Sequence, residues 1–344
     1  MERRPLSDRI SNFEQNVITL LSQRQAVDRV VRLAGDASNR AFFRVFYTTG
    51  ATAVVMAYLD AQPEGEETFL EVQQFLHGLE LPVPKVLACY PQERMIVLED
   101  LGDDLLETLV ERSDQDRITE LYELAVDLLF EMRRATETRD SGCGAFTLAF
   151  DEEKLMQEMN FFMTNFVRGL CGRSMSPAAS ATLDAFFTKI CSMLASEPRI
   201  FTHRDYHSRN LILHQGRLVM IDFQDARMGP AQYDLASLLR DSYVTLPEEL
   251  ADTLVDRYAE ETGQTSQDLK DRFRYVFDVM SLQRNIKALG TFGYQVHVRD
   301  ARRYLESIPR TGAYVARNIA KYEEFALFRA VVEDLICYPA SRFA

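Results

Sequence analysis

Three polar residues, Asp205, Asn210 and Asp222, have the types and spacing that a phosphoryl transfer could use. Asp205 and Asn210 fall in a polar run, residues 202–210, that cannot form a buried strand. Asp222 directly follows an apolar run, residues 218–221. A phosphoryl transfer needs a carboxylate that orients the attacking hydroxyl and accepts its proton, and hard oxygen ligands for magnesium. Two carboxylates and an amide oxygen could supply both.

A hairpin is the element that would position these residues. Two short apolar runs, residues 211–213 and 218–221, flank a Gln-Gly pair at residues 215–216. Short apolar runs around a glycine turn predict two paired strands. Such a hairpin would bring the three polar residues toward one point.

The motif resembles the catalytic and metal-binding segments of the protein-kinase-like fold. It consists of His203-Arg204-Asp205, Asn210 five residues after Asp205, and Asp222-Phe223 after the hairpin. The resemblance implies that Asp205 is the catalytic base, that Asn210 and Asp222 bind Mg²⁺, and that His203 is structural. At the position of His207 a protein kinase usually has Lys, whereas small-molecule kinases have His. The resemblance implies that His207 contacts the nucleotide.

Asp234 opens an apolar helix soon after this motif. In kinase-like folds, an Asp at this place braces the catalytic loop by accepting backbone N–H groups. A simple helix N-cap is the alternative interpretation. The short segment between Asp222 and Asp234 leaves no room for an activation segment of protein-kinase length.

Composition indicates a cytoplasmic enzyme. The chain has 344 residues, enough for two lobes, with 47% hydrophobic and 26% charged residues. It shows no run of 18 apolar residues, so we expect no membrane partner. The N-terminal residues also show no apolar segment typical of a secretory signal. The five cysteines are scattered and include no Cys-x-x-Cys pair, which fits a reducing compartment.

The net charge of −13 argues against a nucleic-acid partner. Charge is uneven, because residues 281–330 carry nine Lys and Arg against four Asp and Glu, a net +5. We call residues 281–330 the basic segment. It is either a solvated face or a pocket for an anion.

The first hundred residues predict a small lobe with an antiparallel sheet. The predicted helices cover residues 7–25 and 65–79, and the predicted strands cover residues 27–33, 41–47, 52–58, 83–88 and 95–98. The turn before the second strand is similar to the phosphate-covering turn of small-molecule kinases. That similarity places Ser38, Asn39 and Arg40 over the nucleotide phosphates, although an ordinary hairpin turn is the alternative.

Met56 is a departure from the kinase pattern. The strand over residues 52–58 should carry the Lys that grips the α- and β-phosphates, and no Lys precedes residue 84. Either another cation, Arg40 or Arg44, replaces that Lys, or phosphate binding relies on backbone and metal.

An apolar strand that enters the acidic link Glu99-Asp100-Leu101-Gly102 resembles a kinase hinge. The resemblance implies that the adenine edge bonds to backbone near Glu99 and Leu101. We place the lobe boundary here, with residues 1–100 as the N-lobe and residues 101–344 as the C-lobe.

The C-lobe should be mainly helical. Helices are expected over residues 114–138, 151–166 and 280–290, with a Gly-Thr-Phe-Gly run at residues 290–293 ending the last. Candidate ligands of the acceptor substrate are Glu158, Gln283, Arg284 and Lys287. The alternative for Glu158 is a surface acid, and the alternative for the helix that carries the other three is a solvated basic face. Arg284 and Lys287 share one face of that helix.

Over nearly its full length, the chain is similar to the aminoglycoside-phosphotransferase superfamily. Within it, the best match is a group of bacterial kinases that phosphorylate N-acetylmuramate and N-acetylglucosamine at C1 during cell-wall recycling. The resemblance implies an α+β bilobal protein-kinase-like fold and use of ATP and Mg²⁺. It also implies an amino-sugar substrate, a product passed to a uridylyltransferase, and a monomer. The alternatives are an aminoglycoside kinase and a nucleotide-binding regulatory module without catalysis.

Overall fold

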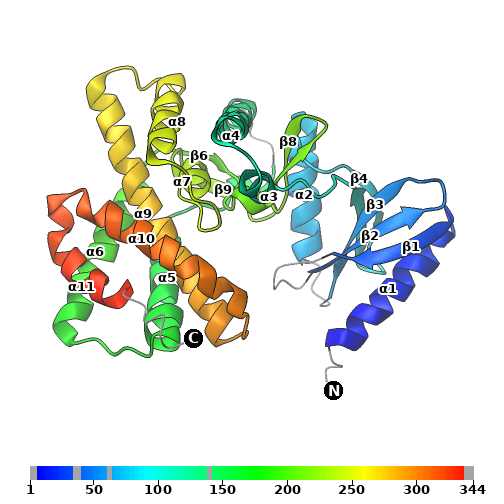
Figure 1. Ribbon diagram of the computed structural model, residues 1–344, viewed down its shortest axis with the longest axis horizontal. Coiled ribbons are helices and arrows are strands. Elements are labelled where there is room, and N and C mark those ends of the chain that lie inside the picture. The colour runs from blue at the N-terminus through cyan, green and yellow to red at the C-terminus, as the bar shows by residue number, and fades with distance from the viewer. Residues whose placement is uncertain (1–5, 34–39, 60–63, 138–141, 337–344) are drawn as a thin grey trace. The chain divides into compact units, whose positions relative to one another are not determined.

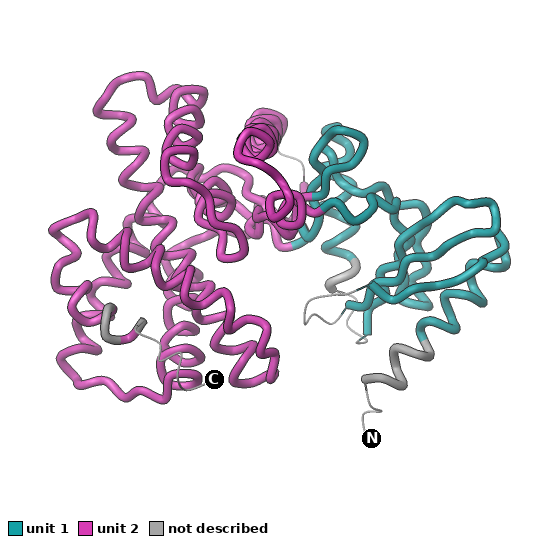
Figure 2. Tube along the Cα trace, in the orientation of Figure 1, with its two compact units in different colours: residues 1–104, 212–224 teal, residues 105–211, 225–344 magenta. Residues whose placement is uncertain are grey.

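The computed structural model describes residues 6–33, 40–59, 64–137 and 142–336. Two compact units make up the chain, and Figure 2 colours them separately. The first unit comprises residues 1–104 and 212–224, and the second comprises residues 105–211 and 225–344. The lobe boundary after residue 100 stays a prediction.

A five-stranded antiparallel sheet dominates the first unit, in the order β1-β2-β3-β5-β4 (Figure 1). The strands are β1 (Val27–Arg32), β2 (Arg40–Tyr47), β3 (Thr52–Tyr58), β4 (Val86–Tyr90) and β5 (Met95–Glu99). The helices are α1 (Leu6–Ser22) and α2 (Glu64–Gly78). In β2, every second side chain over most of the strand is buried, as expected for a strand with one face on a core.

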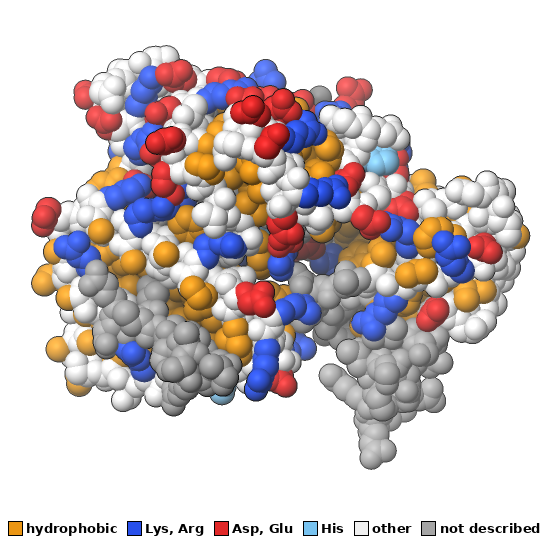
Figure 3. Space-filling view, in the orientation of Figure 1, with side chains coloured by type: hydrophobic (Ala, Val, Ile, Leu, Met, Phe, Trp, Pro, Cys, Tyr) orange, Lys and Arg blue, Asp and Glu red, His pale blue; other side chains and the backbone are white. Residues whose placement is uncertain are grey.

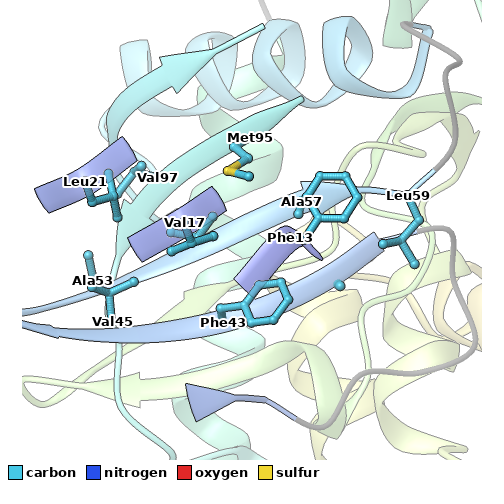
Figure 4. Close-up of a cluster of buried hydrophobic side chains, with 12 residues drawn as sticks. Phe13, Val17, Leu21, Phe43, Val45, Ala53, Ala57, Leu59, Met95 and Val97 are labelled. Carbon is cyan, nitrogen blue, oxygen red and sulfur yellow. The ribbon is translucent and has the colours of Figure 1, made fainter. Parts of the chain in front are cut away.

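The core of this unit lies between α1 and the sheet (Figure 4). Phe13, Val17 and Leu21 follow one another at helical spacing, and all three are buried against strand residues such as Phe43 and Val97. Burying each large apolar side chain contributes about 1.5–3 kcal/mol. The apolar face of the predicted first helix therefore packs on the sheet, as its amphipathic pattern predicts.

The segment 212–224 is far in sequence from the rest of the first unit, yet it is hydrogen-bonded into it. It carries the hairpin of β7 (Leu211–His214) and β8 (Arg217–Met220). The Met220 N–H donates to the Pro82 carbonyl at 2.9 Å. The Phe223 ring stacks on Phe69 of α2, with 5.1 Å between the ring centroids. The predicted hairpin is confirmed, and its contacts anchor Asp222 in the first unit.

The second unit is mainly helical, with a small antiparallel pair of strands, β6 and β9. Its helices are α3 (Leu106–Glu111), α4 (Gln115–Thr136), α5 (Glu152–Phe162), α6 (Pro177–Ser196), α7 (Tyr233–Leu239), α8 (Glu248–Glu261), α9 (Gln267–His297), α10 (Ser307–Ala320) and α11 (Ala326–Ile336). The two strands are β6 (Arg199–Thr202) and β9 (Arg227–Pro230). Within the described ranges, none of the helices has the length and apolar character needed to cross a bilayer.

The expectation that a helix ends at residues 290–293 is wrong. Helix α9 has 31 residues and continues through Gly290 and Gly293 to His297. A Cβ on Gly290 would lie 2.8 Å from the Phe162 Cα, and one on Gly293 would lie 2.7 Å from the backbone of Asn165.

The two glycines therefore serve close packing between helices rather than helix termination. They face α5 and the π-helix that follows it, η2 (Met163–Leu170). Glycine in a helix interior costs roughly 0.5–1 kcal/mol relative to Ala, and here the close approach of two backbones offsets that cost. This packing fixes α9 beside α5, and both helices carry predicted site residues.

Candidate active site

The loop predicted to be catalytic, residues 203–210, is called the catalytic loop below. It leaves strand β6 and enters a short 3₁₀ turn, η3 (Ser208–Asn210). Arg204 has a φ of 81°, which is uncommon for a residue other than Gly. The His207 N–H donates to the Asp205 carbonyl at 3.1 Å, and the Asn210 side-chain Nδ2 donates to the same carbonyl at 2.9 Å. The loop thus closes on itself around Asp205.

Asp234 holds the first half of this loop. Its carboxylate accepts the His203 N–H at 2.6 Å and the Arg204 N–H at 3.0 Å. Burial raises the pKa of Asp234 to about 7, while these two N–H groups oppose the rise. Asp234 is the second residue of α7, so it is not the N-cap, and its contacts have the form expected of a brace. A role of Asp234 in catalysis stays a proposal.

Asp205 lies among cations. The Lys287 Nζ is 3.3 Å from Asp205 Oδ1, and 26% of the Asp205 side chain is exposed. Burial raises the pKa of Asp205, but Lys287, followed by Arg204, Arg284 and His207, holds that pKa well below its ordinary value. Asp205 is therefore an ionised carboxylate that solvent or a ligand can reach.

Arg284 contacts the catalytic loop directly. Its Nη1 donates to the Arg204 carbonyl at 2.8 Å, and its guanidinium lies 4.5 Å from the centroid of the Tyr233 ring. The structure thus gives Arg284 a loop-holding contact that the sequence did not suggest. Its predicted binding of substrate stays a prediction.

Glu158 of α5 and Gln283 of α9 face each other. Gln283 Nε2 donates to Glu158 Oε2 at 2.9 Å. Both residues are buried, with Gln283 0% exposed and Glu158 6% exposed. Neither is among the residues that line the cavity described next. Their predicted contact with an acceptor is not tested, and in this structure they join two helices.

A cavity of about 150 Å³ opens beside the catalytic loop in the second unit. Four of the residues predicted from the sequence line it: Asp205, His207, Arg284 and Lys287. The His207 ring meets the Tyr243 ring edge-on at 5.4 Å, and Tyr243 also lines the cavity. The structure therefore brings the predicted base and two predicted acceptor ligands to one wall.

Sequence reasoning missed several lining residues, among them Asp241, Tyr243 and Phe292. For Asp241 the available signal was a second acid seven residues after Asp234, just beyond the end of α7. Phe292 lies in the helical pattern of α9, where an aromatic residue is more often core than site, and Tyr243 lies outside the helices and belongs to none of the quoted motifs.

Several Lys and Arg side chains of the basic segment pair with or donate to other residues of the second unit. Lys321 pairs with Asp278 at 2.6 Å, Arg317 pairs with Glu248, and Arg310 donates to the Ser242 carbonyl at 3.0 Å. On the face drawn in Figure 3, Lys and Arg side chains lie interspersed with Asp and Glu. Among the lining residues of the cavity, the Lys and Arg that come from this segment are Arg284 and Lys287.

Asp222 in the first unit has a φ of 64° and is paired with Arg40. Arg40 Nη2 lies 2.6 Å from Asp222 Oδ1, and Arg40 Nη1 lies 3.9 Å from the sulfur of Met56. Arg44, the other candidate replacement for the strand Lys, instead pairs with Asp103 at 2.7 Å. The geometry favours Arg40 as the cation beside Met56.

The expected hinge residues lie where β5 ends. The Glu99 N–H donates to the Lys85 carbonyl at 2.9 Å, and the Leu101 carbonyl lies 3.1 Å from His214 Nδ1. Adenine binding near these residues stays a prediction. Ser38 and Asn39 lie outside the described residues.

Comparisons with known proteins agree on one family. A model described as "Phosphotransferase enzyme family" matches residues 29–269. The chain is 31% identical to an N-acetylmuramate/N-acetylglucosamine kinase of Neisseria meningitidis, over 88% of this chain and 89% of that protein. It is 29% identical to the enzyme of the same name from Pseudomonas aeruginosa, over 86% of each chain.

Solved structures show the same fold at low identity. An ADP-bound aminoglycoside phosphotransferase superposes with a TM-score of 0.60 at 16% identity, covering 87% of this chain and 96% of the other. A choline kinase from Cryptosporidium parvum gives a TM-score of 0.61 at 13% identity, covering 94% and 99%. The predicted α+β, protein-kinase-like fold class is confirmed.

Proposed function

This chain belongs to the phosphotransferase enzyme family, and from that premise we propose that it is an ATP-dependent kinase of amino sugars. The proposed acceptors are N-acetylmuramate and N-acetylglucosamine, which appear in the names of its relatives, and the proposed target is the C1 hydroxyl. The observation that carries the proposal is the carboxylate of Asp205 at the wall of a cavity, 3.3 Å from Lys287.

Asp205 acts as the base in this proposal. Its carboxylate hydrogen-bonds the attacking hydroxyl and accepts its proton as the new P–O bond forms and the bond to ADP breaks. Neighbouring cations hold the pKa of Asp205 below its ordinary value, so its carboxylate is a weaker base than a free one. The C1 hydroxyl is the most acidic hydroxyl of such a sugar, because the ring oxygen withdraws electron density from C1, so a weak base suffices there.

Magnesium fits the donors that the motif provides. Asn210 turns its Nδ2 to the Asp205 carbonyl, which leaves the amide oxygen for a metal, and Asp222 offers a carboxylate. In the described part of the chain, no cluster of three or more His, Cys, Asp or Glu could hold a metal by itself. That suits Mg²⁺, which usually takes one or two carboxylates and completes its shell with phosphates and water. When bound, the ion would neutralise charge on the β- and γ-phosphates.

Nucleotide binding would use Arg40 in place of the strand Lys. Arg40 already lies beside Met56 and Asp222, so a cation is present where the kinase pattern expects one. We retain Ser38, Asn39, His207 and the backbone at Glu99 and Leu101 as further proposed nucleotide contacts.

Recognition of the acceptor would use Arg284 and Lys287. Both cations line the cavity that holds Asp205, and the lactyl carboxylate of N-acetylmuramate is a suitable counter-ion. An aminoglycoside is a polycation and would meet repulsion from the same two side chains. The charge of the cavity wall therefore supports a neutral or anionic amino sugar.

Phosphorus NMR of ATP and Mg²⁺ with a panel of acceptors tests the proposal. We expect a sugar 1-phosphate signal with N-acetylmuramate or N-acetylglucosamine and none with kanamycin. Turnover of kanamycin alone would overturn the substrate class, and phosphate at another hydroxyl would overturn the C1 assignment. A 1-phosphate product is a substrate of the kind that a uridylyltransferase consumes, so we propose such an enzyme as the next step. We also propose that the kinase is a monomer and that it acts in the cytoplasm.

A further inference from the structure

We propose that Asp241 is a positioning residue for the transfer, a second brace that holds the C-terminal half of the catalytic loop. The inference rests on the proposed function in one respect, because its kinetic test uses the proposed sugars. Asp241 is 4% exposed and lies just after α7, while Asp234 lies near the start of the same helix. One short helix thus presents a buried carboxylate at each end.

The contacts of Asp241 are directed at Ser208. Asp241 Oδ2 accepts the Ser208 N–H at 3.0 Å and the Ser208 hydroxyl at 2.5 Å. Ser208 is fully buried, so both donors depend on partners inside the protein. Asp241 Oδ1 accepts the Tyr243 N–H at 2.9 Å. A single side chain therefore links the catalytic loop to a residue of the cavity wall.

The position of Ser208 explains why this link bears on catalysis. Asp234 fixes the loop at residues 203 and 204, and Asp241 fixes it at residue 208. Asp205 lies between these two anchor points, and Asn210 follows the second by two residues. The two braces together set the spacing between the proposed base and the proposed metal ligand.

The segment that carries Asp241 is itself held from two sides. Asn285 of α9 donates to the Arg240 carbonyl at 3.0 Å. From α10, Arg310 donates to the Ser242 carbonyl and Thr311 donates to the Ser242 hydroxyl at 2.8 Å. A brace is effective only if it is anchored, and these bonds anchor residues 240–242.

Steady-state kinetics of Asp241→Asn test the proposal. Asn keeps the size of the side chain but loses the charge and one acceptor oxygen, so Ser208 should shift. We expect kcat to fall about 10- to 100-fold, in line with the cost of a misplacement near 1 Å. The Mg²⁺ concentration for half-maximal activity should rise severalfold, because Asn210 moves with Ser208.

Asp278→Asn is the matched control. Asp278 is also a buried carboxylate, at 3% exposed, and it accepts bonds from Lys321 and Tyr322, which are not residues of the loop. We expect a lower melting temperature, with kcat per folded enzyme and Mg²⁺ dependence within about twofold of wild type. If Asp241→Asn behaves in the same way, Asp241 is only a structural residue and the proposal is wrong.

Ser208→Ala gives a milder second test. It removes the hydroxyl bond but keeps the backbone N–H bond to Asp241, so kcat should fall less than in Asp241→Asn. The double variant should be no slower than Asp241→Asn, because the two residues act through one contact. Should Asp241→Asn fail to fold, an unchanged kcat in Ser208→Ala would refute the brace.

Hydrogen exchange separates this proposal from the proposed function. If the wild-type enzyme phosphorylates neither sugar, the proposed function fails, but the loop can still be examined. The Ser208 and Tyr243 amides should exchange faster in Asp241→Asn than in wild type, and at the wild-type rate in Asp278→Asn. Equal exchange in all three proteins would overturn the role of Asp241.

Discussion

Asp205 must be ionised to accept a proton, and it must also be free to meet a hydroxyl. Its neighbours favour the first requirement, since Lys287 and two arginines offset the cost of burying the charge. The same Lys287 lies against Oδ1, so an acceptor hydroxyl would approach the exposed part of the carboxylate. The pKa of Asp205, which these cations lower, is therefore the property to change first by mutation.

Asp205→Asn should lower kcat by about 10² or more, because an amide cannot accept the hydroxyl proton. Calorimetry should show that the variant still binds ATP, since the nucleotide contacts are proposed to lie elsewhere. Near-normal turnover would remove Asp205 from the role of base.

Lys287→Met should move the acidic limb of the pH–rate profile to higher pH. Lys287 is the principal group that lowers the pKa of Asp205, whereas burial raises it. Without the cation that pKa rises, so the carboxylate becomes protonated, and activity is lost, at a higher pH than in wild type. The measurement is kcat between about pH 4 and pH 8.

Lys189→Met is the control for this profile, because Lys189 pairs with Glu324 on a half-exposed surface of the same unit. Its profile should match that of wild type. An acidic limb that stays in place in Lys287→Met would mean that Lys287 does not set the ionisation of the base.

Two helices organise the second unit around this carboxylate. Helix α7 presents Asp234 near its start and is followed by Asp241, and α9 presents Gln283, Arg284 and Lys287 from its middle. The position of α9 depends on Gly290 and Gly293, which allow the backbone of residues 162–166 to approach. Packing remote from the chemistry thus sets where the cations lie.

Gly293→Ala should destabilise the protein by about 1–3 kcal/mol, the usual cost of overpacking. The added Cβ would lie 2.7 Å from the backbone carbonyl of Asn165, which cannot move as a side-chain end could. Thermal unfolding measures the change. Gly78→Ala, where a Cβ would meet nothing within 4 Å, should leave stability unchanged or raise it by up to about 1 kcal/mol, since Gly78 ends helix α2. Equal melting temperatures for the two variants would contradict the packing role.

On the scale of the whole molecule, the predicted site residues are divided between the two units. The first unit holds Asp222, Arg40 and the expected hinge, and the second holds Asp205, Asn210 and the cavity. Segment 212–224 belongs to the first unit although it follows the catalytic loop in sequence. Of the two proposed metal ligands, Asp222 belongs to the first unit and Asn210 to the second.

Asp222→Ala should abolish the magnesium-dependent part of nucleotide binding. A ligand at 100 times its dissociation constant stabilises a protein by about 2.7 kcal/mol, so wild type should melt higher with ATP and Mg²⁺ than with ATP and EDTA. The variant should show no such difference, whereas Asp205→Asn should keep it. A magnesium effect of wild-type size in Asp222→Ala would refute the metal assignment.

The sequence alone determined the features that depend on local pattern. Strands β2 and β3, helix α1 and the hairpin of β7 and β8 follow from the spacing of apolar residues and from glycine turns, which are properties of neighbours in the chain. The motif of His203-Arg204-Asp205, Asn210 and Asp222-Phe223 was enough to indicate the protein-kinase-like fold, because motif residues on adjacent elements keep a nearly constant separation in sequence.

Tertiary structure decided the features that depend on distant contacts. Gly290 and Gly293 look like helix terminators until α5 and η2 are packed against them. Lys287 lies 82 residues from Asp205 and Asp241 lies 33 residues from Ser208, so no local pattern could pair them. Arg284 was predicted as a substrate ligand and also proves to hold the Arg204 carbonyl. Which partner a buried charged group meets is set by the packing of whole helices, and that packing is not encoded in any single stretch of the chain.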